Sequence, residues 1–406
     1  MKNSSLQKIA EHILQNFKKK ITELHEPTFD KIDYKYLNKC LNDGIVSTTG
    51  NGEIRNKFEK IISKYTKSKF SIATINGVSA LHACVKAANI QQNQEVLIPS
   101  ITFVASAHAV LYAGAIPHFV EASEDDLGID PEKLRIYLGK ITKYKNGNYY
   151  NKNTGRIIKG IMPVHVFGNA CKIDQLIKIA KKFNLITIED ATEALGTFFK
   201  NKHVGTFGDM GVISFNGNKI ITSGGGGMIL VKNSKNAKKI LHTISNAKIN
   251  HKWEYKHDQI GFNYRMPNLN AALGYAQFKK FNKIVSKKKQ IYFFYKKIFQ
   301  KYKNFSILEP SKKTISNHWL NTLIIDNKKI NKNYLIKIFQ KLNIKVRPIW
   351  KPLHTLKHLK KYPKMKLNIS NKIYEKVISL PSGPDILKDK IKKIKKLNNK
   401  EKLYAR

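Results

Sequence analysis

The segment Val212-Ile-Ser-Phe-Asn-Gly-Asn-Lys219-Ile-Ile-Thr-Ser-Gly-Gly-Gly-Gly227 is the most informative part of this chain. Its apolar beginning predicts a β-strand, and the Asn-Gly pair predicts a tight turn that carries one lysine. Glycine allows the backbone to approach a ligand closely, so a lysine in this setting suits a Schiff base to an aldehyde cofactor. The chain contains 74 Lys and Arg residues, so the interpretation depends on the surroundings of Lys219 and not on its charge.

Short apolar runs alternate with helical segments on both sides of this segment, from about residue 58 to residue 233. The runs expected to form strands are 71–75, 96–98, 116–120, 161–166, 185–188, 212–215 and 228–231. This alternation is typical of an α/β fold, and it predicts a mostly parallel seven-stranded sheet with helices on both faces. A polar insert at 142–155 contains an Asn-Gly pair and predicts a surface hairpin.

The length of 406 residues allows more than one domain. We expect an N-terminal helical segment and link at 1–50, a large cofactor-binding α/β domain at 51–265, and a long helix with a small C-terminal α+β domain at 266–406. The long helix is predicted from 269 to about 302, and a basic, solvated helix is predicted at 385–406.

The formal net charge of +46 raises the question of nucleic-acid binding. The lysines are spread through nearly every segment, without a helix-turn-helix, a zinc ligand set or an aromatic RNA-binding signature, so we expect no specific nucleic-acid partner and no metal. No apolar run approaches the roughly 20 residues of a membrane span, and the N-terminus lacks the features of a signal peptide. With three widely spaced cysteines, these features predict a cytoplasmic protein with no membrane partner.

Polar and aromatic residues follow the predicted strands, at the edge where open α/β sheets bind ligands. Asn76-Gly-Val-Ser79 opens a helix whose free N–H groups can hold a phosphate, although an ordinary helix cap is the alternative. Phe103 can stack on a flat ring or pack in the core. Ser214 precedes Lys219 by five residues and can offer its hydroxyl to a phosphate.

Two carboxylates belong to the same set. Asp190 follows the strand predicted at 185–188, where it can pair with the protonated nitrogen of a pyridine ring. Glu193 comes one helical turn later and can reach a ring hydroxyl or the substrate. Two carboxylates at this spacing also suit a metal, but no histidine cluster supports one. Together with the phosphate site and Lys219, this set points to pyridoxal 5'-phosphate.

The order of these motifs resembles the DegT/DnrJ/EryC1/StrS family of sugar aminotransferases, which are pyridoxal-phosphate enzymes of fold type I. The resemblance covers nearly the whole chain and rests on Asn-Gly-Val-Ser-Ala-Leu at 76–81, Ile-Pro-Ser-Ile-Thr-Phe at 98–103, Pro-Val-His-Val-Phe-Gly at 163–168, Ile-Glu-Asp-Ala-Thr-Glu at 188–193 and Gly-Phe-Asn-Tyr-Arg-Met-Pro at 261–267. It implies that Lys219 is bonded to the cofactor aldehyde, that Asp190 binds the ring nitrogen, and that Phe103 covers the ring. It also implies that the phosphate is held by Val78, Ser79 and Ser214.

The resemblance further implies a homodimer with shared active sites. Asn263 is expected to complete the phosphate site of the neighbouring subunit, with Arg265 as its rival. Other candidates for contact with the substrate lie near the N-terminus and in the small domain, and each has a structural role as its alternative. They are His25, Ser47, His318, Arg347, Trp350 and His354.

Two positions depart from the usual family pattern. Val78-Ser79 stands where the family usually has Thr followed by Ser or Ala, and Glu193 stands where Gln or His is common. Glu193, the long N-terminal segment and the motif around Lys219 resemble one subgroup. That subgroup makes 4-amino-4,6-dideoxy-N-acetylhexosamine nucleotides, especially in legionaminic acid or bacillosamine-type pathways.

The activity expected from the resemblance is transfer of the amino group of L-glutamate to the 4-keto carbon of a 4-keto-6-deoxy (N-acetyl)hexosamine nucleotide. The product would serve bacterial surface glycans or nonulosonic acids. One alternative is a pyridoxal-phosphate enzyme that aminates C3 or dehydrates the sugar, although dehydratase relatives replace the lysine by histidine. A more distant alternative is a non-catalytic regulatory or nucleic-acid-binding protein that binds pyridoxal phosphate.

Overall fold

The computed structural model describes residues 3–48 and 52–388. Its largest sheet has seven strands. Their order across the sheet is β1 (Phe70–Thr74), β11 (Gly227–Val231), β10 (Met210–Ser214), β7 (Ile186–Asp190), β6 (Ile158–Ile161), β2 (Glu95–Pro99) and β3 (Ile116–Val120). β11 runs antiparallel to both of its neighbours, whereas the other adjacent pairs are parallel. The mostly parallel seven-stranded sheet is confirmed.

One predicted strand lies several residues away from its predicted position. The prediction places it at 161–166, whereas β6 ends at Ile161. Pro163 follows and has no N–H to donate to a ladder, so only Val164 still bridges to Asp190. The chain then enters the short 3-10 helix η1 (Val166–Gly168). The chain therefore leaves the sheet soon after Val164, which lies beside Asp190 at the end of β7.

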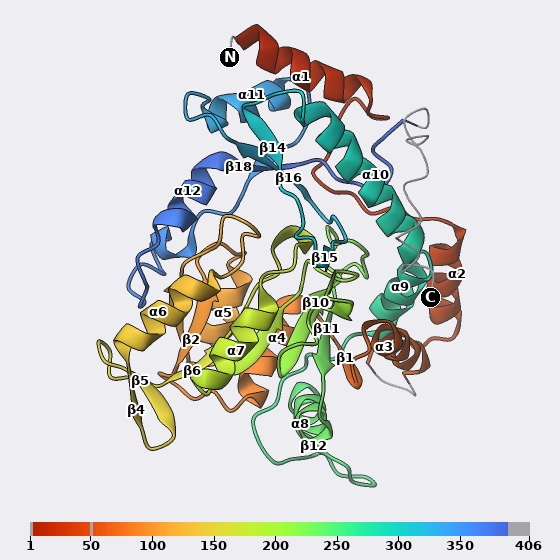
Figure 1. Ribbon diagram of the computed structural model, residues 1–406. Coiled ribbons are helices and arrows are strands. Elements are labelled where there is room, and N and C mark those ends of the chain that lie inside the picture. Colours follow the sequence, from red (N-terminus) through yellow and green to blue (C-terminus); the bar gives the residue numbers. More distant parts are fainter. Residues whose placement is uncertain (1–2, 49–51, 389–406) are drawn as a thin grey trace.

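Helices cover both faces of this sheet (Figure 1). α4 (Gly77–Ala87), α5 (Ala105–Tyr112) and α8 (Ser234–Ile244) pack on one face, while α6 (Pro131–Ile141) and α7 (Ile173–Lys182) pack on the other. Successive residues of a strand point to opposite faces. Leu97 accordingly joins the cluster with α6 and α7, and Ile98 joins the cluster with α4 and α5. The strands are apolar along their whole length because both faces of the sheet are buried under helices.

The predicted long helix at 269–302 is wrong, because the structure has two helices there. α9 (Asn268–Lys279) and α10 (Phe281–Phe299) meet at Lys280, whose backbone is not helical (φ −107°, ψ 11°). The Lys280 ammonium reaches the N-terminal segment, where it donates to the carbonyl of Thr28 (3.0 Å) and pairs with buried Asp33. The break therefore coincides with an anchor for the start of α2 (Lys31–Asn42), which lies beside α9 (Figure 1).

A second sheet has four antiparallel strands in the order β14 (Phe305–Ile307), β16 (Asn321–Ile325), β18 (Val377–Leu380) and β17 (Arg347–Pro348). α1 (Asn3–Gln15), α10 and α11 (Lys332–Lys341) share its hydrophobic cluster, and α12 (Asn368–Lys376) precedes β18. α1 lies beside α11 at the top of the molecule (Figure 1). The two ends of the sequence therefore build the same layer, because Phe17 also bridges to Leu387.

Most of the remaining elements are short. β4 (Thr142–Lys145) and β5 (Asn148–Asn151) form the hairpin predicted at 142–155. The others are α3 (Glu53–Thr66), β8 (Phe198–Phe199), β9 (Lys202–His203), β15 (Thr314–Ile315), β12 (Lys248–Ile249), β13 (Lys256–His257) and the 3-10 helix η2 (Leu353–Thr355). The predicted helix at 385–406 lies outside the described residues beyond 388, and residues 385–388 are not helical. Among the described helices, none is long and apolar enough to cross a membrane.

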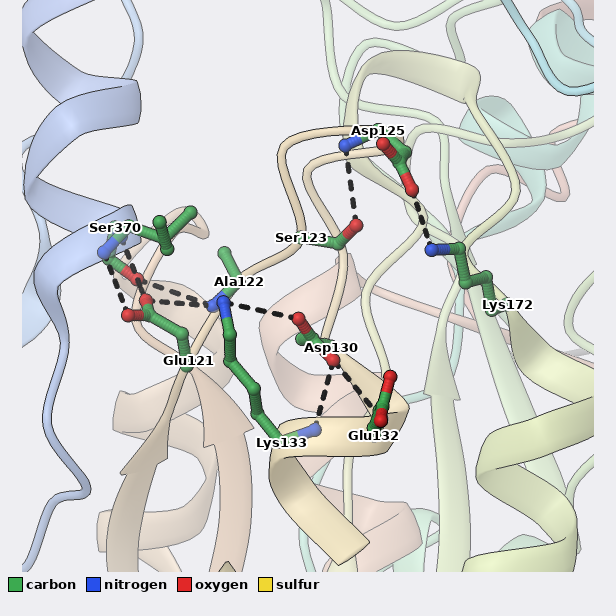
Figure 2. A network of polar contacts seen from close by, with 10 residues as sticks. Glu121, Ala122, Ser123, Asp125, Asp130, Glu132, Lys133, Lys172 and Ser370 are labelled. Carbon is green, nitrogen blue, oxygen red and sulfur yellow. Dashed lines mark hydrogen bonds and ion pairs between the residues drawn. The ribbon is translucent and has the colours of Figure 1, made fainter. Parts of the chain in front are cut away.

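One carboxylate joins the two sheets. Glu121 directly follows β3 and receives the first N–H groups of α12, from Ile369 (2.8 Å) and Ser370 (2.8 Å), together with the Ser370 hydroxyl (2.6 Å). Figure 2 shows Glu121 facing Ser370, with Ala122 donating to the same carboxylate. A helix start carries unpaired N–H donors and a partial positive charge, so a buried carboxylate satisfies both.

We predict that Glu121→Ala lowers the free energy of unfolding by roughly 2–4 kcal/mol, because several buried donors lose their charged acceptor. Urea denaturation followed by tryptophan fluorescence measures the change. The matched control is Glu124→Ala, an exposed position in the same loop, which should leave the midpoint unchanged. Equal midpoints for both variants would contradict the role of Glu121.

Candidate active site

A cavity of about 310 Å³ lies beyond the carboxyl ends of β7 and β10. Open α/β sheets bind their ligands at this edge. Six of the residues predicted to bind the cofactor line the cavity, namely Val78, Phe103, Asp190, Glu193, Ser214 and Lys219. The structure thus brings together residues that lie as far apart in the sequence as Val78 and Lys219. It places their side chains around one space large enough for part of a small ligand.

Lys219 lies on the turn after β10, where its N–H donates to the carbonyl of Asn216 (3.0 Å). Its ammonium nitrogen is 3.2 Å from Oε1 of Glu193 and 4.2 Å from the ring centroid of Trp319. The Trp319 indole N–H donates to the carbonyl of Asn218 (2.8 Å), which fixes the ring against the same turn. A carboxylate and an aromatic face both attract an ammonium group, so the cation of Lys219 is held between them.

Gly227, the last of the four glycines that follow Lys219, has a packing role. Residues 224–227 do not line the cavity. A Cβ atom on Gly227 would lie 2.6 Å from the carbonyl oxygen of Asn76 and 2.6 Å from Oγ1 of Thr74. Glycine is therefore needed there for close packing of β11 against β1 and the start of α4, and not for space beside a ligand.

Asp190 is the last residue of β7 and is buried. Its Oδ2 accepts a hydrogen bond from the Ser106 hydroxyl (2.7 Å), and its Oδ1 accepts one from the Thr192 N–H (3.2 Å). These bonds orient the carboxylate within the cavity that holds Lys219. An oriented carboxylate at this place can pair with a protonated ring nitrogen, which increases the electron-withdrawing power of the ring.

The start of α4 is both an ordinary helix cap and a possible phosphate site, the two alternatives that the sequence left open for residues 76–79. The Asn76 side chain caps the helix by accepting the N–H of Ser79 (2.8 Å). The backbone N–H of Ser79 is therefore used within the helix cap, and only its hydroxyl could still bind a ligand. Ser79 does not line the cavity, so its predicted contact with the phosphate stays a prediction. A Cβ atom on Gly77 would be 3.2 Å from Cβ of Ser214, so glycine lets the helix start approach the Ser214 hydroxyl. The helix start and Ser214 together form a cradle suited to a phosphate.

Glu189 and Glu193 lie on either side of Asp190 in the sequence, and their pKa values are shifted in opposite directions. Burial raises the pKa of Glu189, but His165 and backbone N–H groups outweigh this effect and lower the pKa. Nε2 of His165 lies 3.0 Å from Oε2 of Glu189, and both side chains are buried. Burial raises the pKa of Glu193, and the opposing effects of Lys219 and the Phe167 N–H do not cancel this rise. Of these two glutamates, Glu193 is thus the one that more readily takes up a proton.

His25, one of the predicted substrate contacts, does not line the cavity. Both of its ring nitrogens are buried without a hydrogen-bond partner in the described part of the chain. Burial lowers the pKa of His25 well below its usual value, and the charges of Lys288 and Lys219 lower it further. An unpartnered neutral imidazole close to Lys219 fits a ligand hydroxyl, which can both donate and accept.

The other substrate candidates have local roles. His318 is stacked on Tyr292 (4.3 Å between centroids), and burial lowers the pKa of His318 to about 3. His354 shares a hydrogen bond with the Ser100 hydroxyl (2.7 Å). Arg347 and Ser47 are exposed and do not line the cavity, whereas Trp350 does. Substrate contact by these residues stays a prediction.

The two candidates for the shared phosphate site differ. Arg265 is 3.4 Å from Glu59 and lines a separate surface hollow, so its charge is already paired within the chain. Asn263 is exposed and follows the β12–β13 hairpin. The geometry therefore favours Asn263 over Arg265 as the residue available to a second subunit.

Several cavity residues were not singled out from the sequence. Trp319, Thr102, Thr192, Asn216 and Asn218 line the cavity, and Ser106 bonds to Asp190. Asn216 and Asn218 flank the turn that carries Lys219, so their position in sequence was a usable signal. Trp319 is 100 residues from Lys219 (319 − 219), and only the fold brings it there. Within residues 3–48 and 52–388, no group of three or more His, Cys, Asp or Glu side chains is placed to hold a metal ion.

Comparison with known proteins places this geometry among sugar aminotransferases. The profile of the DegT/DnrJ/EryC1/StrS aminotransferase family matches residues 27–397. GDP-perosamine synthase of Vibrio cholerae is 33% identical over 91% of this chain and 96% of its own length. UDP-4-amino-4,6-dideoxy-N-acetyl-beta-L-altrosamine transaminase of Campylobacter jejuni is 30% identical over 91% of this chain and 94% of its own length. The solved structure of Helicobacter pylori PseC, an aminotransferase involved in the biosynthesis of pseudoaminic acid, has a TM-score of 0.79 at 25% identity, with 89% and 93% of the two chains covered.

We predict that Asp190→Asn weakens binding of pyridoxal phosphate at least about tenfold, because the ring nitrogen loses its charged partner. Absorbance titration of the apoenzyme measures the affinity. Asp174→Asn removes a surface carboxylate that pairs with Lys200 and should bind like the wild type. Unchanged affinity in Asp190→Asn would contradict the assigned role.

Proposed function

The chain belongs to the DegT/DnrJ/EryC1/StrS aminotransferase family, and from this premise we propose that it transfers the amino group of L-glutamate to the 4-keto carbon of a 4-keto-6-deoxy (N-acetyl)hexosamine nucleotide. It is a sugar aminotransferase that depends on pyridoxal phosphate. The observation that carries the proposal is the common cavity of Lys219 and Asp190. The names of the two relatives include GDP and UDP carriers, so both nucleotides enter the test below.

The residues present fit the cofactor. The N-terminus of α4 and the Ser214 hydroxyl suit its phosphate, and Asp190 suits its ring nitrogen. Phe103 lines the cavity and suits one face of the ring. When bound, pyridoxal phosphate supplies an aldehyde carbon and an electron-withdrawing ring. Position 219 is occupied by lysine, and not by the histidine of the dehydratase relatives, which supports amination over dehydration.

In this proposal, different side chains of the cavity bind the cofactor, move protons and exclude water. Asp190 holds a proton on the ring nitrogen through the carboxylate that Ser106 orients. Nζ of Lys219 removes the α-proton of the amino donor and later delivers a proton to C4 of the sugar. Trp319 and Trp350 enclose the cavity from the side of the second sheet and limit the access of water to Nζ. The neutral imidazole of His25 receives a sugar hydroxyl in this proposal.

We further propose a homodimer in which Asn263 completes the neighbouring phosphate site. Phe103 is 53% exposed in the isolated chain, although it lines the cavity. Tyr255 (85% exposed) and Ile260 (87% exposed) lie shortly before Asn263, on and after a hairpin that extends away from the body of the molecule (Figure 1). Exposed large apolar side chains at such a projection support a contact with a second copy.

We propose that the aminated sugar nucleotide made by this enzyme serves bacterial surface glycans, in legionaminic acid or related nonulosonic acid pathways.

The main experiment follows the two halves of the reaction separately. We expect L-glutamate to convert the absorbance of the bound aldehyde into that of the amine form, and a 4-keto-6-deoxy sugar nucleotide to restore it. Mass analysis of products from a panel with UDP and GDP carriers identifies the acceptor and the carbon aminated. Conversion by glutamate without restoration by any sugar of the panel would contradict the proposed acceptor.

The lysine gives a second test. Lys219→Ala should reduce turnover by a factor of about 1,000 or more, because the group that moves the protons is lost. Lys200→Ala, which removes a surface lysine paired with Asp174, should retain wild-type turnover. A steady-state assay measures the turnover of both variants. Full activity in Lys219→Ala would refute the proposal.

Subunit mixing tests the shared site. Lys219→Ala and Asn263→Ala homodimers are each expected to be weak, since every site lacks one group. After exchange of subunits, half of the dimers are mixed and contain one intact site, so activity should rise to about a quarter of the wild-type value. Size-exclusion chromatography verifies the dimer. Absence of any gain after verified exchange would show that Asn263 serves its own subunit.

A further inference from the structure

His82 lies on α4, the helix whose N-terminus forms the phosphate cradle, and it is only 4% exposed. Its Nδ1 is 3.3 Å from the hydroxyl oxygen of Tyr264, within hydrogen-bond distance. The His82 ring also packs edge-on against the rings of Phe262 (4.8 Å between centroids) and Tyr264 (5.9 Å). Asn263 lies between these two aromatic residues in the sequence. His82 therefore contacts both neighbours of the residue that we assign to the shared phosphate site.

The backbone at Asn263 is extended and held from one side. Asn263 forms an antiparallel β-bridge with Ser245, and the N–H of Tyr264 donates to the carbonyl of Ile244 at the end of α8 (3.0 Å). Successive side chains of an extended segment point to opposite sides. The rings of Phe262 and Tyr264 are accordingly stacked on each other (5.0 Å between centroids), on the side of His82. Asn263 points the other way and is exposed.

The imidazole acts on this segment through its shape and one hydrogen bond. Its Nε2 is buried and has no partner in the part of the chain that the structure describes, so Tyr264 supplies the polar contact of the ring. Burial, with a further effect of Lys86, lowers the pKa of His82 to about 4. The ring is thus neutral at neutral pH and adds no charge to the site.

The direction of the Asn263 side chain depends on this contact. The backbone hydrogen bonds fix where the segment lies, but they leave it free to turn about its own axis. The two aromatic rings prevent that turn while they rest on His82. Removal of the imidazole would release both rings and let the amide of Asn263 point in several directions.

We propose that His82 is a positioning residue that aims Asn263 at the phosphate in the neighbouring subunit. The proposal rests on the proposed homodimer with shared sites, and extends it. α4 then serves two sites of the dimer: its N-terminus at Gly77 faces the phosphate of its own subunit, and His82 orients the donor for the other. A change at His82 should therefore impair the partner's site and spare the site of its own subunit.

Subunit mixing tests this assignment, with cofactor at a concentration that does not saturate the single variants. The His82→Ala homodimer should bind pyridoxal phosphate about tenfold more weakly than the wild type, because a hydrogen bond to a charged group is lost. After exchange with Lys219→Ala, activity should rise to about a quarter of the wild-type value, since one site of each mixed dimer is intact. After exchange with Asn263→Ala, activity should stay at the mean of the two homodimers, because neither site receives a well-aimed Asn263.

A merely structural role of His82 within its own subunit predicts the reverse pattern, with a gain from Asn263→Ala and none from Lys219→Ala. That pattern, or wild-type cofactor affinity in the His82→Ala homodimer, would overturn the proposal. Val85→Ala is the matched control, because it removes a buried apolar side chain from the same helix. It should lower the midpoint of urea denaturation and keep the wild-type affinity for pyridoxal phosphate.

A second variant covers the case in which His82→Ala does not fold. Tyr264→Phe keeps the aromatic ring and loses only the hydroxyl that faces Nδ1 of His82, and it enters the same two mixtures with the same expected and opposing results. Exchange of Lys219→Ala with Asn263→Ala separates the two levels of the argument. No gain in that pair would refute the shared site itself, whereas a gain there with the reverse pattern for His82→Ala would refute the role of His82 alone.

Discussion

The parallel pairing of β7 with β10 is the constraint on which the active site depends. Asp190 ends β7 opposite Val212, and Ser214 follows two residues further along β10. The two strands therefore release their side chains at one edge, and the turn after β10 returns Lys219 to the same space. A shift of this register by one residue would leave Asp190 and Ser214 on opposite faces of the sheet. The cofactor cradle exists because hydrogen bonds between two buried strands hold this alignment.

The interior electrostatics contrast with the surface of a chain whose formal charge is +46. Three carboxylates, Glu189, Asp190 and Glu193, lie buried within four residues of one another. Each has a different set of donors: several backbone N–H groups and His165 for Glu189, Ser106 for Asp190, and Lys219 with the Phe167 N–H for Glu193. Donor supply, and not net charge, explains why the pKa of buried Glu189 is lowered while that of buried Glu193 is raised.

The second sheet contributes more than a cover. Trp319 precedes β16 and packs over Lys219, and its backbone carbonyl accepts a hydrogen bond from the buried ammonium of Lys288 (2.8 Å). The same ammonium donates to the carbonyl of Ser382 after β18 (2.6 Å). Glu121 connects this layer to the end of β3 on the far side of the cavity. The position of the aromatic wall above Nζ thus depends on contacts at both ends of the second sheet.

Local patterns in the chain were enough for the α/β alternation, the hairpin at 142–155 and the residues at the strand ends, because apolar periodicity and turn residues act over short distances. They were not enough for the break at Lys280, where no glycine or proline interrupts the helical pattern and the anchor is Asp33, far away in sequence. They also assigned the glycines at 224–227 to ligand space, whereas at Gly227 the neighbour is the backbone of Asn76. The amino-acid order alone determined which groups we propose to carry the chemistry, since lysine, aspartate and serine occur at recognisable turns. Only the tertiary structure decided that Trp319 faces Lys219 and that Glu193 contacts Nζ, because such contacts depend on how separate elements pack and leave no local periodicity in the sequence.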